Sequence, residues 1–144
     1  MDDFMQIAIE EAKKGLEEGG IPIGAVLTKD NRLLSKGHNM RVQEKNPIMH
    51  AEMTCIRNAG LIKNYAGAIL YSTLMPCFMC AGAIVEFKIP TVITGESKTY
   101  KGAKKFLQRN EVKVIDLNLH ECRQLMESFI EKNSLLWKED IGEL

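Results

Sequence analysis

The chain has 144 residues, 45% of them hydrophobic, and its 19 lysine and arginine side chains balance 19 aspartate and glutamate side chains. This length and composition exclude an intrinsically disordered chain and predict one domain, residues 1–144, with a buried core. Because there is no basic excess, we expect a small-molecule substrate and no nucleic acid partner, although such a chain can still carry a local basic patch.

The sequence contains four cysteines, no signal-peptide pattern and no apolar run of about 18 residues that would cross a membrane. Nothing in this cysteine usage is typical of a disulfide-stabilised secreted protein. We therefore expect a cytoplasmic protein without a membrane partner.

Hydrophobic periodicity predicts alternating helices and strands along the chain. Helices are expected over 2–18, 48–59, a segment beginning at Pro76, 103–108, 118–132 and 134–141. Strands are expected over 22–28, 33–38, 68–73, 91–94 and 112–115, with a tight turn at 29–32 and a loop at 40–47. The charged side chains of the first helix are expected to form a solvated face without a function: Glu10, Glu11, Lys13, Lys14, Glu17 and Glu18.

The order of these elements predicts an α/β protein. A helical segment separates the strands at 91–94 and 112–115, so these two strands are expected to be parallel and joined by a right-handed crossover. The complete pattern predicts a three-layer α/β/α sandwich, in which a mixed five-stranded sheet carries helices on both faces. The helices that begin near 48 and 76 should start at the same end of the sheet, where ligands usually bind.

Three residues have the types and spacing of zinc ligands: Cys77 and Cys80 lie three positions apart, and His50 precedes them. Structural zinc sites use four protein ligands, whereas catalytic sites use three and keep the fourth position for water. Pro76 suits the first position of a helix, which would put both thiols in the first turn, where the helix dipole favours thiolate. We therefore expect one Zn²⁺ per chain with a bound water or hydroxide.

Glu52 adds an acid/base group to this set. The pattern H-x-E…P-C-x-x-C is typical of zinc deaminases, in which the glutamate is a general acid/base and not a ligand. Such a carboxylate takes a proton from the attacking water and later protonates the departing nitrogen. Because residues two apart on a helix do not face one another, His50 and Glu52 can reach one site only from a helix terminus.

Other interpretations of these residues were weighed. A redox Cys-x-x-Cys pair would leave His50 and Glu52 without a role, and a structural zinc site would need a fourth ligand. The candidates for that ligand, none at a paired spacing, are His38, His120, Cys55 and Cys122. We expect core or surface positions for the two histidines and a small buried hydrophobe at Cys55. By sequence alone, Asn39 after a strand is more often a turn former than a ligand contact.

The chain resembles the cytidine deaminase superfamily through His50-Ala51-Glu52 and Pro76-Cys77-Phe78-Met79-Cys80. It is similar to the fungal-type cytosine deaminases in Gly37-His38-Asn39-Met40-Arg41 and in the tail from Trp137 to Glu143. This resemblance implies a cytidine deaminase-like fold, a homodimer, and hydrolysis of free cytosine to uracil and ammonia in pyrimidine salvage.

The same resemblance implies roles for further residues. Asn39 would hold the N1/O2 side of the base, backbone N–H groups of Ala51 and Cys77 would contact substrate oxygens, and Asp140 would contact the exocyclic amine. The apolar walls and lid would come from Trp137, Tyr100, Ile23 and Leu74.

Three residues depart from the fungal pattern: Ala51 where glycine is expected, Tyr100 where phenylalanine is expected and Met75 where serine is expected. With Tyr100 and Met75 at these positions, the substrate could also be a modified pyrimidine or another aminated ring. Three alternatives are kept: a tRNA adenosine deaminase, a guanine deaminase, and a non-enzymatic zinc-stabilised binding module. The balanced charge and the acidic tail argue against the first, and Glu52 argues against the last.

Overall fold

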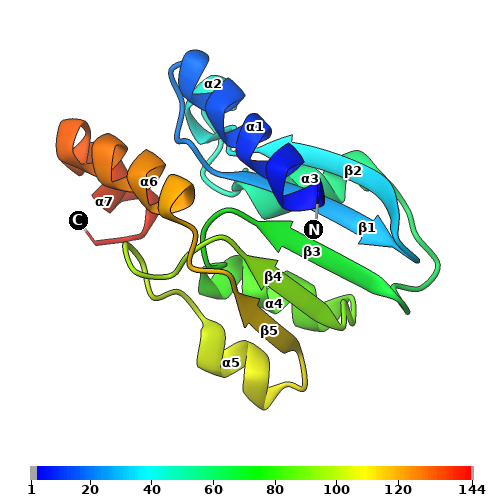
Figure 1. Ribbon diagram of the computed structural model, residues 1–144. Coiled ribbons are helices and arrows are strands. Elements are labelled where there is room, and N and C mark those ends of the chain that lie inside the picture. The colour runs from blue at the N-terminus through cyan, green and yellow to red at the C-terminus, as the bar shows by residue number, and fades with distance from the viewer. Residues whose placement is uncertain (1–2, 144) are drawn as a thin grey trace.

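The computed structural model describes residues 3–143 and contains a five-stranded mixed sheet between two layers of helices (Figure 1). The strands are β1 Gly24–Lys29, β2 Arg32–His38, β3 Ala68–Ser72, β4 Thr91–Thr94 and β5 Lys113–Asp116. The helices are α1 Asp3–Glu17, α2 Arg41–Glu44, α3 Ala51–Ala59, α4 Phe78–Glu86, α5 Lys104–Arg109, α6 His120–Lys132 and α7 Ser134–Asp140. The predicted three-layer α/β/α architecture is confirmed.

The strands lie in the order β2-β1-β3-β4-β5. β1 is antiparallel to β2 and β3, whereas β3, β4 and β5 run parallel. The predicted parallel pairing of β4 with β5 across a helix is therefore confirmed. Asp30 and Asn31, with φ of 51° and 63°, form the predicted tight turn between β1 and β2, because two left-handed central residues match the twist of a two-residue hairpin.

Alternate residues of the central strands enter two cores on opposite faces of the sheet. On β1, Ala25 and Leu27 belong to the core that includes residues of α3 and α4. Val26 belongs to the core that α1 and α6 cover. Figure 1 shows the resulting layers, with the C-terminal helices α6 and α7 side by side at one end of the molecule. None of the helices in residues 3–143 is both long and apolar enough to span a membrane.

Gly24 allows α1 to lie directly on β1. A Cβ atom at this position would lie 2.0 Å from the carbonyl oxygen of Ala8 and 2.7 Å from the backbone nitrogen of Ala12. Both are backbone atoms of α1, so they cannot move aside as a side chain would. The close contact fixes the segment that leads from α1 into the sheet.

The structure corrects three local predictions. The predicted loop at 40–47 contains the short helix α2, and the helix predicted from residue 48 begins at Ala51. Glu11, predicted to be solvated, is buried and contacts the ring of His38. The first helix was predicted from residue 2, which lies outside the described residues, and within residues 3–143 it begins at Asp3.

Candidate metal centre and substrate pocket

His50 and Cys77 occupy equivalent positions on two neighbouring helices. His50 is the N-cap of α3, with ψ of 165°, and Cys77 is the N-cap of α4, with ψ of 176°. The backbone carbonyl of each residue accepts the first hydrogen bond of its helix. The N–H of Thr54 donates to His50 at 2.9 Å, and the N–H of Ala81 donates to Cys77 at 2.8 Å. Pro76 therefore precedes α4, and its predicted place as the first helical residue is wrong, because Cys77 keeps an extended backbone.

The N-cap position also explains how His50 and Glu52 reach one site. His50 has an extended backbone, whereas Glu52 is the second residue of α3, so the rule for residues two apart inside a helix does not hold here. Both side chains line the same cavity. The expectation that the two residues meet at a helix terminus is thus met.

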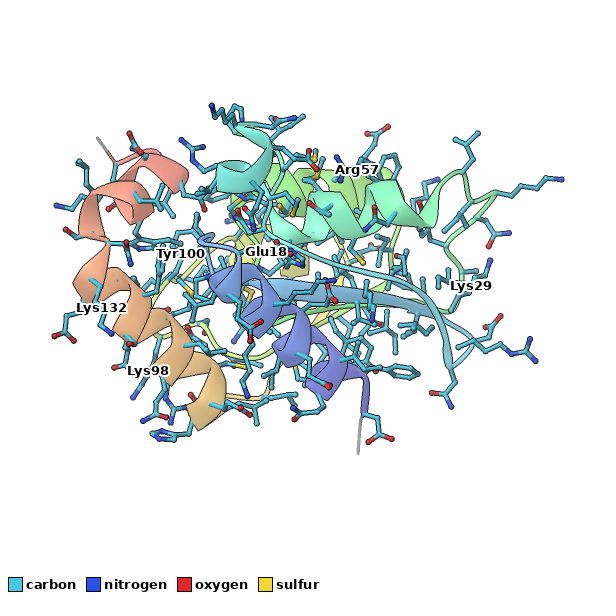
Figure 2. The ribbon with its side chains drawn as sticks, turned by 90° about the horizontal axis from the view of Figure 1, so that it is seen from above. Glu18, Lys29, Arg57, Lys98, Tyr100 and Lys132 are labelled. Carbon is cyan, nitrogen blue, oxygen red and sulfur yellow. The ribbon has the colours of Figure 1, made fainter. Side chains whose placement is uncertain are left out.

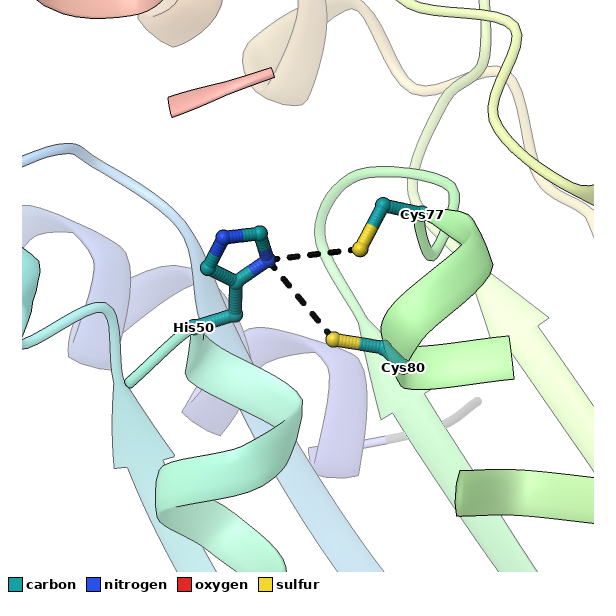
Figure 3. Close-up of side chains that lie close together, drawn as sticks. All are labelled: His50, Cys77 and Cys80. Atoms are coloured by element: carbon teal, nitrogen blue, oxygen red, sulfur yellow. Dashed lines mark hydrogen bonds between the residues drawn. The ribbon is translucent and has the colours of Figure 1, made fainter. Parts of the chain in front are cut away.

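The three predicted metal ligands converge. Nδ1 of His50 lies 3.4 Å from Sγ of Cys77 and 3.7 Å from Sγ of Cys80, and the three donor atoms all lie within 4.8 Å of one another (Figure 3). Tetrahedral zinc with ordinary bond lengths to nitrogen and sulfur would separate these atoms by about 3.6 Å. One nitrogen and two sulfur donors at these separations fit zinc.

The two thiols differ in acidity because they contact each other. The hydrogen bond from Cys80 lowers the pKa of Cys77 to about 4, against the opposing effect of burial. The same contact, together with burial, raises the pKa of Cys80 well above its usual range. Cys77 is therefore stabilised as the thiolate, the form that binds a metal.

Asp140 supports the outer nitrogen of His50. Its Oδ1 lies 3.2 Å from Nε2 of His50, and its side chain is 3% exposed. Burial lowers the pKa of His50, but the nearby Asp140 carboxylate and Cys77 outweigh it and raise the value to about 10. A carboxylate behind a ligating histidine orients the ring toward the metal. Sequence reasoning assigned Asp140 to the substrate only, and no local spacing signals this second contact.

Glu52 is buried beside the thiols. Its side chain accepts a hydrogen bond from Oγ of Ser72 at 3.3 Å, and the residue is 4% exposed. Burial first, and the negative charge of Cys77 second, raise the pKa of Glu52 to about 7. A carboxyl group that titrates near neutral pH can both accept and donate a proton during one reaction cycle.

A small cavity of about 20 Å³ lies against these groups. Its lining residues are Ile23, His50, Glu52, Leu74, Met75, Cys77, Tyr100, Trp137, Asp140 and Ile141. A cavity of this size has room for about one water molecule. Of the predicted site residues, only Cys80, Asn39 and Ala51 do not line it.

Tyr100 and Trp137 form one wall of the cavity. Their rings meet edge to face, with centroids 5.8 Å apart and an interplanar angle of 86°. Figure 2 shows Tyr100 on the side of the molecule where the C-terminal helices lie. Because Trp137 belongs to α7, the last helix closes the site.

Asn39 lies just outside the lining. It is completely buried, its N–H donates to the carbonyl of Ile23 at 3.0 Å, and its Oδ1 accepts from the N–H of Arg41 at 2.9 Å. Its Nδ2 has no hydrogen-bond partner among the described residues. Asn39 is thus a turn former, as its sequence context suggested, and it also keeps a free buried donor next to a cavity wall.

Residues 1–96 match the cytidine and deoxycytidylate deaminase zinc-binding region. Over 142 residues the chain is 43% identical to the cytosine deaminase of Candida albicans, covering 96% of this chain and 95% of that enzyme. Over 109 residues it is 41% identical to the tRNA-specific adenosine deaminase of Streptococcus pyogenes serotype M18, covering 73% of this chain and 69% of that protein.

Solved structures share the fold. A chain from a study of A-to-I editing by tRNA:A34 deaminases has a TM-score of 0.73 at 31% identity, covering 85% of this chain and 97% of that chain. Guanine deaminase from Nitrosomonas europaea has a TM-score of 0.73 at 17% identity, covering 86% and 81% of the two chains, and supports the fold alone. The matched region contains His50, Cys77 and Cys80, and the chain belongs to the cytidine and deoxycytidylate deaminase family.

Proposed function

We propose that this deaminase is zinc-dependent and hydrolyses free cytosine to uracil and ammonia, a reaction of pyrimidine salvage. The observation that carries the proposal is the position of α7, which brings Trp137 and Asp140 against the residues around the metal ligands. A site closed in this way favours a small planar base. A ribose or a polynucleotide would need more room at the α7 wall of the cavity than a free base does.

The cavity also constrains how a base enters. Trp137 and Asp140 of α7 line it, so we expect α7 to move outward when a base enters and to return afterwards. The comparison with the Candida albicans cytosine deaminase supports the proposed substrate, because the alignment covers 96% of this chain and 95% of that enzyme.

Three residues offer groups that suit a pyrimidine. Nδ2 of Asn39 can donate to O2 of the base, and the N–H of Ala51, the first residue of α3, is one that no intrahelical bond uses. The buried carboxylate of Asp140, which lines the cavity and contacts His50, can also accept from the exocyclic amine. We assign these three contacts to the substrate.

The chemistry requires proton transfer by the chain itself. Zinc held by His50, Cys77 and Cys80 would supply a Lewis acid that makes water nucleophilic near neutral pH. Glu52 accepts a proton from the attacking water and delivers it to N3 of the ring. It then takes the second proton from the hydroxyl group now bonded to C4 and passes it to the amine, which leaves as ammonia while C4 becomes a carbonyl. Cytosine and water are thereby converted to uracil and ammonia, and Glu52 ends in its starting state.

We further propose a homodimer in which the exposed apolar side chains around α4 are covered. Phe78 is 66% exposed, Met79 36% and Phe87 42%. Phe78 and Met79 are adjacent at the start of α4, and exposed apolar side chains that lie together mark interaction surfaces. Sedimentation analysis should give a dimer for the wild type and a monomer for Phe78→Asp, and a monomeric wild type would contradict this part of the proposal.

The substrate is tested by measuring ammonia release from the zinc-loaded protein with cytosine, cytidine, guanine and a tRNA anticodon stem-loop in parallel. Turnover of cytosine but not cytidine is the expected result. The second candidate is a tRNA adenosine deaminase, which the 41% identity to the Streptococcus pyogenes protein favours. Activity on the stem-loop, with tight binding that weakens steeply with salt, would support that candidate and overturn ours.

A further inference from the structure

The ring of His38 is held between two carboxylates. Nδ1 lies 2.8 Å from Oε1 of Glu11 and Nε2 lies 2.8 Å from Oε1 of Glu18. His38 and Glu11 are each 7% exposed. Glu18, labelled near the end of α1 in Figure 2, is more accessible, with its side chain 37% exposed. We call these three residues the His38 clamp.

Both ring nitrogens of His38 are engaged at once, each 2.8 Å from a glutamate oxygen. Hydrogen bonds to a carboxylate are shorter and stronger than those between neutral groups. The hydrogen bonds from His38 and from Gln43 lower the pKa of Glu18, with a smaller effect of Lys14. The other charged group facing the clamp is Lys36, whose Nζ lies 3.9 Å from Oε2 of Glu11.

Packing prevents the ring from turning away. A Cβ atom at Gly15 of α1 would lie 3.1 Å from Cδ2 of His38, so the ring already fits closely against the helix backbone. Glu11 is on the same helix and Glu18 follows its end. The His38 clamp therefore ties the last residue of β2 to α1 through one fixed side chain.

The next residue is Asn39, which has the buried donor described above. Leaving such a buried amide group unpaired is unfavourable, so the surrounding structure must hold it in place. Two bonds do so locally, from Asn39 N–H to Ile23 and from Arg41 N–H to Asn39 Oδ1. The first of these bonds continues the pairing of β1 with β2 beyond Gly24 and His38, and the His38 clamp adds a side-chain contact from the same end of β2 to α1.

We propose that the His38 clamp positions Asn39 for the base by fixing the exit of β2 against α1. His38, Glu11 and Glu18 do not line the cavity and are positioning residues, not catalytic ones. The inference rests on the proposed function, because it takes the Asn39 side chain as a contact to the substrate.

The kinetic test uses His38→Gln, which can donate to only one carboxylate at a time. KM for cytosine should rise about tenfold or more while kcat changes less than about threefold, because a contact present in both ground and transition states is weakened. Ser35→Ala is the matched control. Ser35 is buried on the same strand and donates to the carbonyl of Cys55 at 2.8 Å, so its loss should lower stability without raising KM.

Two variants of Glu18 keep the proposal testable if His38→Gln does not fold. Glu18→Gln keeps an acceptor for the ring and should retain a KM within about threefold of wild type, whereas Glu18→Ala should raise KM as His38→Gln does. Equal KM values for wild type, Glu18→Ala and His38→Gln would overturn the proposal.

Nuclear magnetic resonance separates this inference from the proposed function. The side-chain amide of Asn39 should give one sharp pair of signals that broadens or shifts in Glu18→Ala and in His38→Gln. Failure of the wild type to deaminate cytosine would refute the proposed function alone. An Asn39 amide unchanged in both variants would refute the positioning role whatever the substrate is.

Discussion

Oδ1 of Asp140 lies 3.2 Å from Nε2 of His50, so the last helix contacts the metal-ligand set through a buried carboxylate. The opposite nitrogen of the same ring faces the thiols of Cys77 and Cys80 (Figure 3). Arg41 approaches the same carboxylate oxygen at 3.8 Å. One side chain of α7 therefore both lines the cavity and contacts the ring of His50.

This contact predicts that Asp140→Ala weakens metal binding as well as turnover. Loss of a carboxylate behind a ligating histidine typically lowers metal affinity about 10- to 100-fold. Asp140→Asn keeps the size of the side chain and loses its charge, so its metal affinity should lie between those of the wild type and Asp140→Ala. Chelator competition measures affinity, and circular dichroism checks the fold. Unchanged affinity with lost turnover would restrict Asp140 to the substrate.

Glu52→Gln should separate chemistry from metal binding. Removal of a general acid/base lowers the rate about 10²- to 10⁴-fold, whereas zinc content should stay at one per chain because Glu52 is outside the ligand set. Ser72→Ala, which removes the 3.3 Å hydrogen bond to Glu52 and a 2.8 Å hydrogen bond to the carbonyl of Leu74, should lower the rate much less. Retained turnover in Glu52→Gln would rule out the assigned role.

Removing the metal should expose one reactive cysteine. With a pKa of about 4, Cys77 is a thiolate throughout pH 6–8, so its alkylation rate should be nearly constant there. An ordinary thiol would react about tenfold faster for each pH unit over that range. Zinc should suppress the reaction. Peptide mass spectrometry identifies the site, and a rate that climbs with pH would contradict the lowered pKa.

Two buried cysteines are the internal controls of that measurement. Burial raises the pKa of Cys55 and of Cys122 to about 12, so both should stay unmodified at pH 8 with or without zinc. Their modification would indicate that metal removal had unfolded the protein.

Gly24→Ala should destabilise the fold through a backbone clash. The added Cβ would meet the carbonyl of Ala8 at 2.0 Å, so the free energy of unfolding should fall by about 3 kcal/mol or more. Gly60→Ala is the comparison, because a Cβ atom at Gly60 would meet no other atom, but the backbone there has a φ of 75°. Backbone strain alone should lower the free energy of unfolding of this variant by about 1–3 kcal/mol. Urea unfolding measures both. Equal losses of unfolding free energy in the two variants would mean that α1 can shift away from β1 to make room for the added Cβ atom.

Much of the fold and the ligand set could be predicted from local patterns. The parallel pairing of β4 with β5 follows from the helix between them, and His50, Cys77 and Cys80 are identified by residue type and spacing. Hydrophobic periodicity and ligand spacing depend only on residues close together in the sequence, so both can be recognised without a structure. The boundaries were less certain, because an N-cap such as Cys77 differs from the first helical residue by a single torsion angle.

The sequence by itself determined which residues can bind zinc, which carboxylate can move protons and which segments build the sheet. Only the tertiary structure decided that Asp140 meets His50, that Glu11 is buried against His38, and that α7 closes the cavity. These contacts join segments far apart in the chain. They depend on strand register and on how closely helices pack on the sheet, and neither quantity leaves a signal in the spacing of the residues themselves.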